Sequence, residues 1–551
     1  MRTNSNAATV ALQAATAASE GGRFEAALQH AQEAVGHDPS RADAWFVLGT
    51  AALSLARLDE AEQAFAQALD RVPSASRAAA RILVLRAQAL VGLSRWADAE
   101  AAVSTAEHSP STDPSIQDTL GTVLCRLNMA DRALRHLQAA ARACPNDAQM
   151  QFNCGAGLRF VGRMNEAEIF FERSIASSPT FTQGHLALAY TKRCTAETTH
   201  IVRLEQAYTR LQAEPNMAPV ERARLGYALF KEYDDLGDTD RAWSHLQKAN
   251  DVAAVEQPWD PRAEERVTQS IRGQLAPNEL PKPFDSAAPQ TRYIFIVGLP
   301  RSGTTLVERI LAAHSQVRSM GETPVFPAVV ARAMYDARPD AGGAITSSRS
   351  AAYSSVDWAA VAMQYRRETA FLSGGASFAI DKLPQNHMWV GFIRLAFPDA
   401  AVIHVQREPM DVLFGAFKLM MGAAHGWANR LDHLVEHFCC YRALMDHWKC
   451  WPGPAAVDVL LERLIANPEH HIRRVLDHCG LKFQDPCLRP HLAAGAVATS
   501  SAAQIRRPIN ADGIGAWHRY RAQLEPLRGA LEHLGYVNKH GLAVDRDASS
   551  L

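Results

Sequence analysis

The chain has 551 residues, of which 47% are apolar and 21% charged, a balance typical of folded proteins that excludes a wholly disordered chain. Because this length exceeds what one hydrophobic core usually spans, we expect two or more domains. Lys and Arg number 57 against 58 Asp and Glu, so the net charge of −1 does not favour a nucleic-acid or membrane partner.

The first half of the sequence contains a repeat. Residues 1–255 are rich in Ala, Leu, Glu, Gln and Arg, and prolines recur 34 residues apart, at Pro39 and Pro73 and again at Pro145 and Pro179. Small residues stand at fixed distances before three of these prolines: Gly49, Ala61 and Ala68 before Pro73, Gly121, Ala133 and Ala140 before Pro145, and Gly155 and Ala167 before Pro179. Small residues allow two helices to approach closely, and a proline ends the second helix of a pair.

This spacing and these residue types resemble the tetratricopeptide repeat, with about five repeats between residues 7 and 180. The resemblance implies that residues 1–255 form an all-α solenoid, in which each helix pair buries its apolar face against the next pair. It also implies that this region binds a partner protein. We expect its groove to hold an apolar or extended peptide segment.

A proline-rich segment follows the repeats. Six prolines fall between Pro258 and Pro289, and this density predicts a linker over residues 256–290. Beyond the linker, over residues 291–545, short apolar runs alternate with stretches of helical character. The expected strands are residues 293–297, 378–380 and 401–405. Alternating strands and helices predict an α/β domain with a parallel sheet.

A glycine-bounded loop follows the first expected strand. Residues 298–305 read GLPRSGTT, and Gly298 and Gly303 have the spacing of a phosphate-binding loop. Backbone N–H groups of such a loop, with the N-terminus of the next helix, can surround an anion. Thr304 stands where a nucleoside triphosphatase carries its lysine, and Arg301 supplies a positive charge instead. The loop therefore predicts a phosphate-bearing ligand other than a nucleoside triphosphate.

The sequence VGLPRSGTTLVE at residues 297–308 resembles the 5′-phosphosulfate loop of sulfotransferases, particularly the tyrosylprotein sulfotransferase-like branch and its bacterial relatives. Further segments in the order of that family lie at residues 317–323, 380–386, 404–411 and 501–510. The resemblance covers about residues 290–540. It implies a P-loop-like fold that uses 3′-phosphoadenosine 5′-phosphosulfate (PAPS) as sulfuryl donor, with no metal.

The resemblance also implies roles for particular residues. Glu322 is expected to take the proton of the acceptor, and Lys382 to stabilise negative charge on the bridging oxygen of the donor. Arg301 is expected to assist the leaving group, and Ser501 to donate a further hydrogen bond. The expected donor-binding residues are Pro300, Arg301, Ser302, Gly303, Thr304 and Thr305 in the loop, with Arg407 and Arg507 at the 3′-phosphate.

Two positions depart from the family pattern. Gly415 stands where the family usually has a serine that binds the 3′-phosphate, and Leu461 stands where it tends to have a tyrosine that contacts adenine. Because no hydroxyl lies between Val412 and Lys418, the lysine or a backbone N–H group is the available substitute.

The sequence as a whole predicts a PAPS-dependent sulfotransferase, with tyrosine of a peptide or protein as the favoured acceptor and the repeats recruiting it. A saccharide or a small hydroxylated metabolite is the alternative acceptor. A second alternative is a repeat scaffold whose degenerate sulfotransferase domain does not turn over. Nine scattered cysteines and the lack of about 18 consecutive apolar residues predict a cytoplasmic protein. The oligomeric state is left open.

Overall fold

The computed structural model describes residues 2–109, 111–214, 218–274, 291–337, 355–451, 456–493, 495 and 504–544. They form two compact units. One comprises Met1–Gly157 and Gln364–Leu372, and the other comprises Leu158–Met363 and Ser373–Leu551. The domain boundaries expected at residues 255 and 290 stay predictions.

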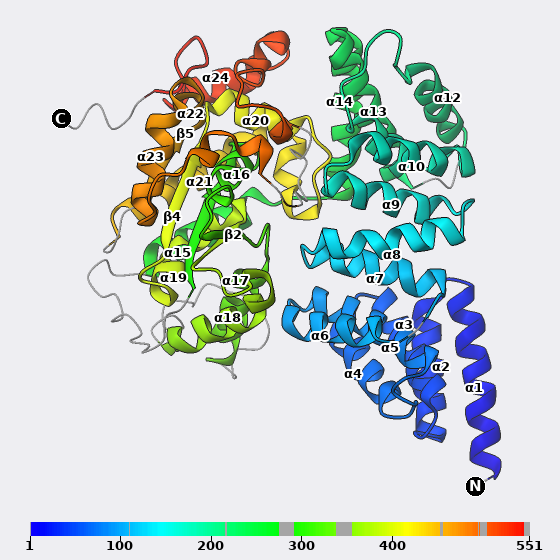
Figure 1. Ribbon diagram of the computed structural model, residues 1–551. Coiled ribbons are helices and arrows are strands. Elements are labelled where there is room, and N and C mark those ends of the chain that lie inside the picture. The colour runs from blue at the N-terminus through cyan, green and yellow to red at the C-terminus, as the bar shows by residue number, and fades with distance from the viewer. Residues whose placement is uncertain are drawn as a thin grey trace. The chain divides into compact units, whose positions relative to one another are not determined.

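Helices make up the N-terminal half of the chain. They are α1 (Arg2–Glu20), α2 (Phe24–His37), α3 (Ala42–Ser54), α4 (Leu58–Leu69), α5 (Arg77–Gly92), α6 (Trp96–Glu107), α7 (Pro114–Arg126), α8 (Ala130–Ala143), α9 (Ala148–Phe160), α10 (Met164–Ser177), α11 (Thr182–Ala189), α12 (Ile201–Gln212), α13 (Pro219–Leu236), α14 (Thr239–Glu256) and α15 (Pro261–Gln274). Helices α1 to α8 pack as successive pairs (Figure 1). The predicted helical repeat is therefore confirmed.

The small residues of the repeat lie where two helices meet. A Cβ on Gly49 of α3 would stand 2.7 Å from the ring of Phe65 on α4. Phe65 is fully buried, together with Ala61 and Ala68 of the same helix. The close approach that the sequence pattern indicated thus depends on the missing side chain at Gly49.

We expect a Gly49→Ala substitution to lower the free energy of unfolding by about 1–3 kcal/mol, because the added methyl group overpacks the α3–α4 contact. Gly36, an exposed residue of α2, is the matched control, since a Cβ there would meet nothing within 4 Å. Gly36→Ala should leave stability unchanged or raise it by up to about 1 kcal/mol. Urea denaturation followed by circular dichroism measures both, and equal effects would contradict the packing argument.

The segment predicted as a linker contains a helix. Residues 261–274 form α15, whereas residues 275–290 lie outside the described part of the chain. Pro261 is the first residue of α15, a position where the missing N–H group of proline costs no hydrogen bond. One of the prolines that led to the linker prediction thus marks the start of a helix, and the linker itself stays a prediction.

A five-stranded parallel sheet follows. Its strands are β1 (Arg292–Gly298), β2 (Val317–Ser319), β3 (Phe378–Lys382), β4 (Ala401–Gln406) and β5 (Val457–Leu460), in the order β2-β3-β1-β4-β5. The three predicted strands are confirmed as β1, β3 and β4, and β2 and β5 are additional short strands at the edges. The all-parallel sheet confirms the predicted α/β class.

The sheet is accompanied by α16 (Thr304–Ala312), α17 (Val325–Asp336), α18 (Trp358–Ser373), α19 (Val390–Ala396), α20 (Pro409–Phe417), α21 (Leu431–Lys449), α22 (Leu461–Ala466), α23 (Pro468–Cys479) and α24 (Glu525–His533). Short 3-10 helices are η3 (Pro384–Trp389), η4 (Ala423–Asn429), η5 (Asp485–Leu488), η6 (Pro490–Leu492), η7 (Gln504–Arg506) and η8 (Ala516–Tyr520).

Alternate residues of the central strand face opposite sides of the sheet. Ile294 and Ile296 of β1 belong to a buried cluster with residues of α16 and α23. Phe295 packs instead against Phe326 of α17, with ring centroids 5.7 Å apart. Because both faces of β1 are covered, its carboxyl end is held rigidly where the phosphate loop begins.

Candidate active site

The phosphate loop joins β1 to α16. Gly298 and Gly303 have φ angles of +154° and +104°, which side chains rarely adopt, and Arg301 has a φ of +72°. A positive φ at a non-glycine residue is a strained conformation that tends to persist at functional sites. Gly303 is the N-cap of α16 and has no side chain to cap it. The first N–H groups of the helix therefore face the loop, as an anion site requires.

The side chains of the loop are packed inward. The predicted donor residues Pro300, Ser302, Thr304 and Thr305 are buried, and Arg301 and Gly303 are half-buried. The hydroxyl oxygen of Ser302 has no hydrogen-bond partner among the described residues. An unsatisfied buried polar atom costs about 1–3 kcal/mol, so such an atom is expected where a ligand supplies the partner.

Arg407 connects the loop to a late part of the chain. Its guanidinium donates to the backbone oxygen of Arg301 at 3.0 Å and to the backbone oxygen of Gly513. Asp411 lies 3.9 Å from the same guanidinium and accepts from the backbone N–H of Gly515 at 2.7 Å. Burial and the charge of Arg407 lower the pKa of Arg301 to about 10. The Arg407 guanidinium thus lies beside Arg301 in the loop, and the phosphate-binding roles expected of both arginines stay predictions.

Strands on both sides of β1 bring site residues to one edge of the sheet. Lys382 ends β3 and pairs in register with Ile296 of β1. Val405, near the end of β4, pairs with Gly298, where the loop starts. Ligands of parallel sheets bind outside the carboxyl ends of the strands. The sheet therefore places Lys382 and Arg407 on either side of the phosphate loop.

Lys382 is fully buried between two carboxylates. Its ammonium contacts Glu322 and lies 3.5 Å from an oxygen of Glu308. Burial lowers the pKa of Lys382, but the charges of Glu308 and Glu322 outweigh this effect and raise it above the usual value. The side chain of Glu322 is 40% exposed, whereas that of Glu308 is 8% exposed. The ammonium stays charged, and only one of its two carboxylates can meet a molecule from solution.

Glu308 is a site residue that the sequence analysis did not single out. It lies on α16, one turn after Thr304, so the helix that begins in the phosphate loop also carries this carboxylate. Its second oxygen accepts a hydrogen bond from the Ser319 hydroxyl at 2.5 Å, at the end of β2. The sequence signal that could have found Glu308 is its spacing of four residues from Thr304, because residues four apart in a helix lie on the same face. On this face Glu308 lies beside the end of the neighbouring strand.

One predicted residue of the described part of the chain, Arg507, is turned to solvent. Arg507 pairs with Asp512, and its side chain is 60% exposed. Ser501 lies outside the described residues, so its predicted role stays a prediction.

The two departures from the family pattern both lie against the phosphate loop. A Cβ on Gly415 would stand 3.2 Å from the Cβ of Arg301, and a Cβ on Gly303 would stand 2.7 Å from the Leu461 side chain. Gly415 thus leaves room for the Arg301 side chain, and Leu461 covers the glycine that ends the loop.

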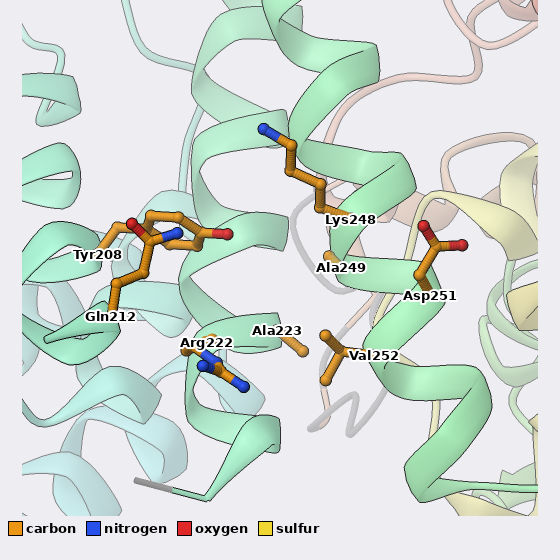
Figure 2. Close-up of a pocket in the computed structure, with 8 residues that line it drawn as sticks. All are labelled: Tyr208, Gln212, Arg222, Ala223, Lys248, Ala249, Asp251 and Val252. Atoms are coloured by element: carbon orange, nitrogen blue, oxygen red, sulfur yellow. The ribbon is translucent and has the colours of Figure 1, made fainter. Parts of the chain in front are cut away.

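A separate surface pocket of about 290 Å³ lies between α12, α13 and α14, and Figure 2 shows the side chains that line it. It is lined by Tyr208, Gln212, Arg222, Ala223, Lys248, Ala249, Asp251 and Val252. None of the predicted catalytic or donor-binding residues lines it. The pocket is therefore not the predicted active site.

Within the ranges that the structure describes, no helix has both the length and the apolar character needed to cross a membrane. Over the same ranges, no three His, Cys, Asp or Glu side chains are grouped so that they could hold a metal ion.

Comparison with known proteins agrees with these observations. Residues 293–485 match the model of the sulfotransferase family, and residues 12–76 match that of the tetratricopeptide repeat. An uncharacterized protein of Aquifex aeolicus is 32% identical over 332 residues, which are 58% of this chain and 43% of that protein. The chain thus spans less than half the length of this relative.

Two animal proteins are similar to a shorter part of the chain. A Caenorhabditis briggsae protein, named as a candidate protein-tyrosine sulfotransferase, is 25% identical over 41% of this chain and 80% of its own length. Protein-tyrosine sulfotransferase 2 of Gallus gallus is 23% identical over 44% of this chain and 70% of its own length. One part of the chain is therefore similar to tetratricopeptide repeats, and a later part is similar to the sulfotransferase family.

Proposed function

We propose that the protein transfers a sulfuryl group from PAPS to a hydroxyl group, with tyrosine of a peptide or protein as the favoured acceptor. The observation that carries the proposal is the buried ammonium of Lys382 between Glu308 and Glu322, one strand away from the phosphate loop. This arrangement provides a fixed positive charge and an accessible base beside an anion site.

The residues of the loop fit the phosphate-bearing end of such a donor. The hydroxyl of Ser302 and the Nε of Arg407 are buried and have no hydrogen-bond partner among the described residues. Both can donate to phosphate oxygens, as can the first N–H groups of α16. PAPS, when bound, supplies the sulfuryl group.

The catalytic roles follow from the position of each charge. Glu322 accepts the proton of the acceptor hydroxyl as the new O–S bond forms. Lys382 and Arg301 stabilise the negative charge that develops on the leaving phosphate as the old S–O bond breaks. Glu308 does not reach the acceptor, and its role is to hold the Lys382 ammonium charged and in place.

Tyrosine is favoured as acceptor because two relatives are named for protein-tyrosine sulfotransfer. The repeats support a protein substrate, since stacked helix pairs present an extended concave surface that suits an unfolded segment of chain. We propose that the repeats recruit this segment and that the reaction takes place in the cytoplasm.

The first test is a thermal-shift titration with 3′-phosphoadenosine 5′-phosphate (PAP), the product of the donor. A ligand at 100 times its dissociation constant stabilises the native state by about 2.7 kcal/mol, so PAP should raise the melting temperature clearly. ATP with magnesium is the control and should not. The absence of a PAP shift would contradict the donor assignment and favour the scaffold.

The second test is transfer from sulfur-labelled PAPS to a panel of acceptors. We expect label in tyrosine-containing peptides and none in the same peptides with phenylalanine in place of tyrosine. Label in saccharides or small phenols alone would keep the sulfotransferase and overturn the protein acceptor. PAP binding without transfer to any acceptor would favour the scaffold.

A further inference from the structure

The turn that carries Glu322 is tied to strand β3 by backbone hydrogen bonds. The N–H of Met320 donates to the oxygen of Ile380 at 2.9 Å. The N–H of Lys382 donates to the oxygen of Gly321 at 3.1 Å, and Gly321 has a φ of +75°, which favours glycine. The side chain of Glu322 is 40% exposed, so packing alone does not fix it. Its position therefore depends on its neighbours in the chain.

Asp381 lies on the opposite face of β3 from Lys382. The two residues are adjacent in the strand, and adjacent side chains of a strand point to opposite faces of the sheet. Asp381 pairs in register with Phe295, whose ring packs against Phe326 of α17. The Asp381 side chain is fully buried on this face. A buried carboxylate is unfavourable unless other groups donate hydrogen bonds to it.

Two side chains donate hydrogen bonds to Asp381. The Thr323 hydroxyl donates to one carboxylate oxygen at 2.9 Å, and the Asn386 amide donates to the other at 3.3 Å. Thr323 and Asn386 are both fully buried. Hydrogen bonds in such surroundings are electrostatically stronger than those in water. Asp381 thus fixes the side chain of Thr323 on the face of β3 that lies away from the Lys382 ammonium.

Thr323 directly follows Glu322 in the chain. A peptide bond is planar, so the Cα atoms of the two residues stay about 3.8 Å apart. On the other side of Glu322, the Ser319 hydroxyl accepts a hydrogen bond from the backbone N–H of Gly321 at 3.0 Å. The backbone of Glu322 is therefore held between two hydroxyl contacts, and the one at Thr323 depends on Asp381.

We propose that Asp381 is a positioning residue for Glu322 and acts through the hydroxyl of Thr323. This inference rests on the proposed function, since it concerns Glu322 as the base of that reaction. A general base must lie within about 2.6–3.2 Å of the group that gives up its proton, and a displacement of about 1 Å can cost about 100-fold in rate. Two adjacent residues of β3 then serve the site from opposite faces. Lys382 stabilises charge on the donor, and Asp381 fixes the distance from the base to the acceptor.

Removal of the Thr323 hydroxyl from the full chain is the first test. Thr323→Val keeps the branched shape and should lower kcat by about 10- to 100-fold, because Glu322 loses its fixed distance from the acceptor. The dissociation constant of PAP and the KM of a tyrosine-containing peptide should change by less than about threefold (about 0.6 kcal/mol). Thr323→Ser keeps the hydroxyl and should retain most of kcat. Thr191→Val is the matched control, since it removes a buried hydroxyl that donates to the backbone of Ala187 in α11, and it should leave kcat unchanged.

A comparison of double variants distinguishes positioning from a structural role. In a Glu322→Gln background the base is absent, so Thr323→Val should change the remaining rate by less than about twofold. Asp381→Ala should lower kcat as Thr323→Val does, and the two changes together should cost little more than the larger one, because both remove the same hydrogen bond. If Asp381→Ala does not fold, the Thr323 variants decide. Transfer from labelled PAPS measures the rates, and calorimetry measures PAP binding.

The outcomes separate this inference from the proposed function. If the wild-type chain transfers label and Thr323→Val keeps its kcat, Thr323 does not position the base and the proposed function stands. An equal loss from Thr323→Val in the Glu322→Gln background would also overturn the inference, because Thr323 would then act on the fold of the site. A matching loss of PAP affinity would overturn it for the same reason. If the wild-type chain binds no PAP and transfers no label, both are overturned.

Discussion

A Lys382→Met variant should lose about 10²- to 10³-fold in kcat while it keeps its affinity for PAP, because removal of one fixed transition-state donor has an effect of that size. The ammonium of Lys382 stands at the carboxyl end of β3 and is fully buried, so water cannot replace it. Methionine keeps an unbranched side chain that is one atom shorter, and it removes the ammonium with its charge and its hydrogen bond to Glu322. Single-turnover transfer from labelled PAPS measures the loss, and calorimetry with PAP measures binding.

The same substitution should also destabilise the protein. Removal of one partner of a buried ion pair costs about 3–5 kcal/mol, since it leaves the buried carboxylate of Glu308 without its counter-charge. A Glu308→Gln/Lys382→Met double variant removes both charges and should recover much of the lost melting temperature. Activity should not recover. If turnover returned together with stability, Lys382 would be a structural residue, and the proposed mechanism would be wrong.

Much of the fold could be predicted because its signals are local. The repeat depends on small residues and prolines at fixed spacing, and Gly49 stands against Phe65 as that spacing requires. The central strands β1, β3 and β4 are apolar runs, and such runs are typical of parallel strands that are covered on both faces. The edge strands β2 and β5 have three and four residues, too few for a periodic pattern to develop.

The parts of the site that escaped prediction depend on contacts between distant segments. Glu308 was visible in the sequence, but most charged residues are solvated, and nothing local marks this carboxylate as buried. Its burial depends on α16 lying beside the ends of β2 and β3, where it meets Ser319 and Lys382. At Gly415, the sequence shows only that the hydroxyl of the family pattern is missing. The structure adds that the side chain of Arg301 occupies the space beside this glycine.

The two carboxylates on Lys382 offer the sharpest test of the base. Glu322→Gln should lower kcat by about 10²- to 10⁴-fold, the range of general-base catalysis, and leave PAP affinity unchanged. Glu308→Gln is the matched control, since it makes the same chemical change on the same ammonium but at a side chain that is 8% exposed against 40% for Glu322. Glu308→Gln should lower the melting temperature more than Glu322→Gln does, because it weakens the positioning of the buried Lys382. It should lower the rate by less than about tenfold, because it removes no proton acceptor.

The reverse order would assign the base to Glu308. That result would require the acceptor to reach a side chain that is only 8% exposed and whose other oxygen already accepts a hydrogen bond from the Ser319 hydroxyl at 2.5 Å. Equal losses in the two variants would mean that the pair acts only through the charge of Lys382, and the proton would then leave to solvent. The exposure of Glu322 is thus the property on which the assignment depends. A Glu322→Asp variant tests it directly, since it keeps the carboxylate and shortens its reach, and it should recover part of the rate that glutamine loses.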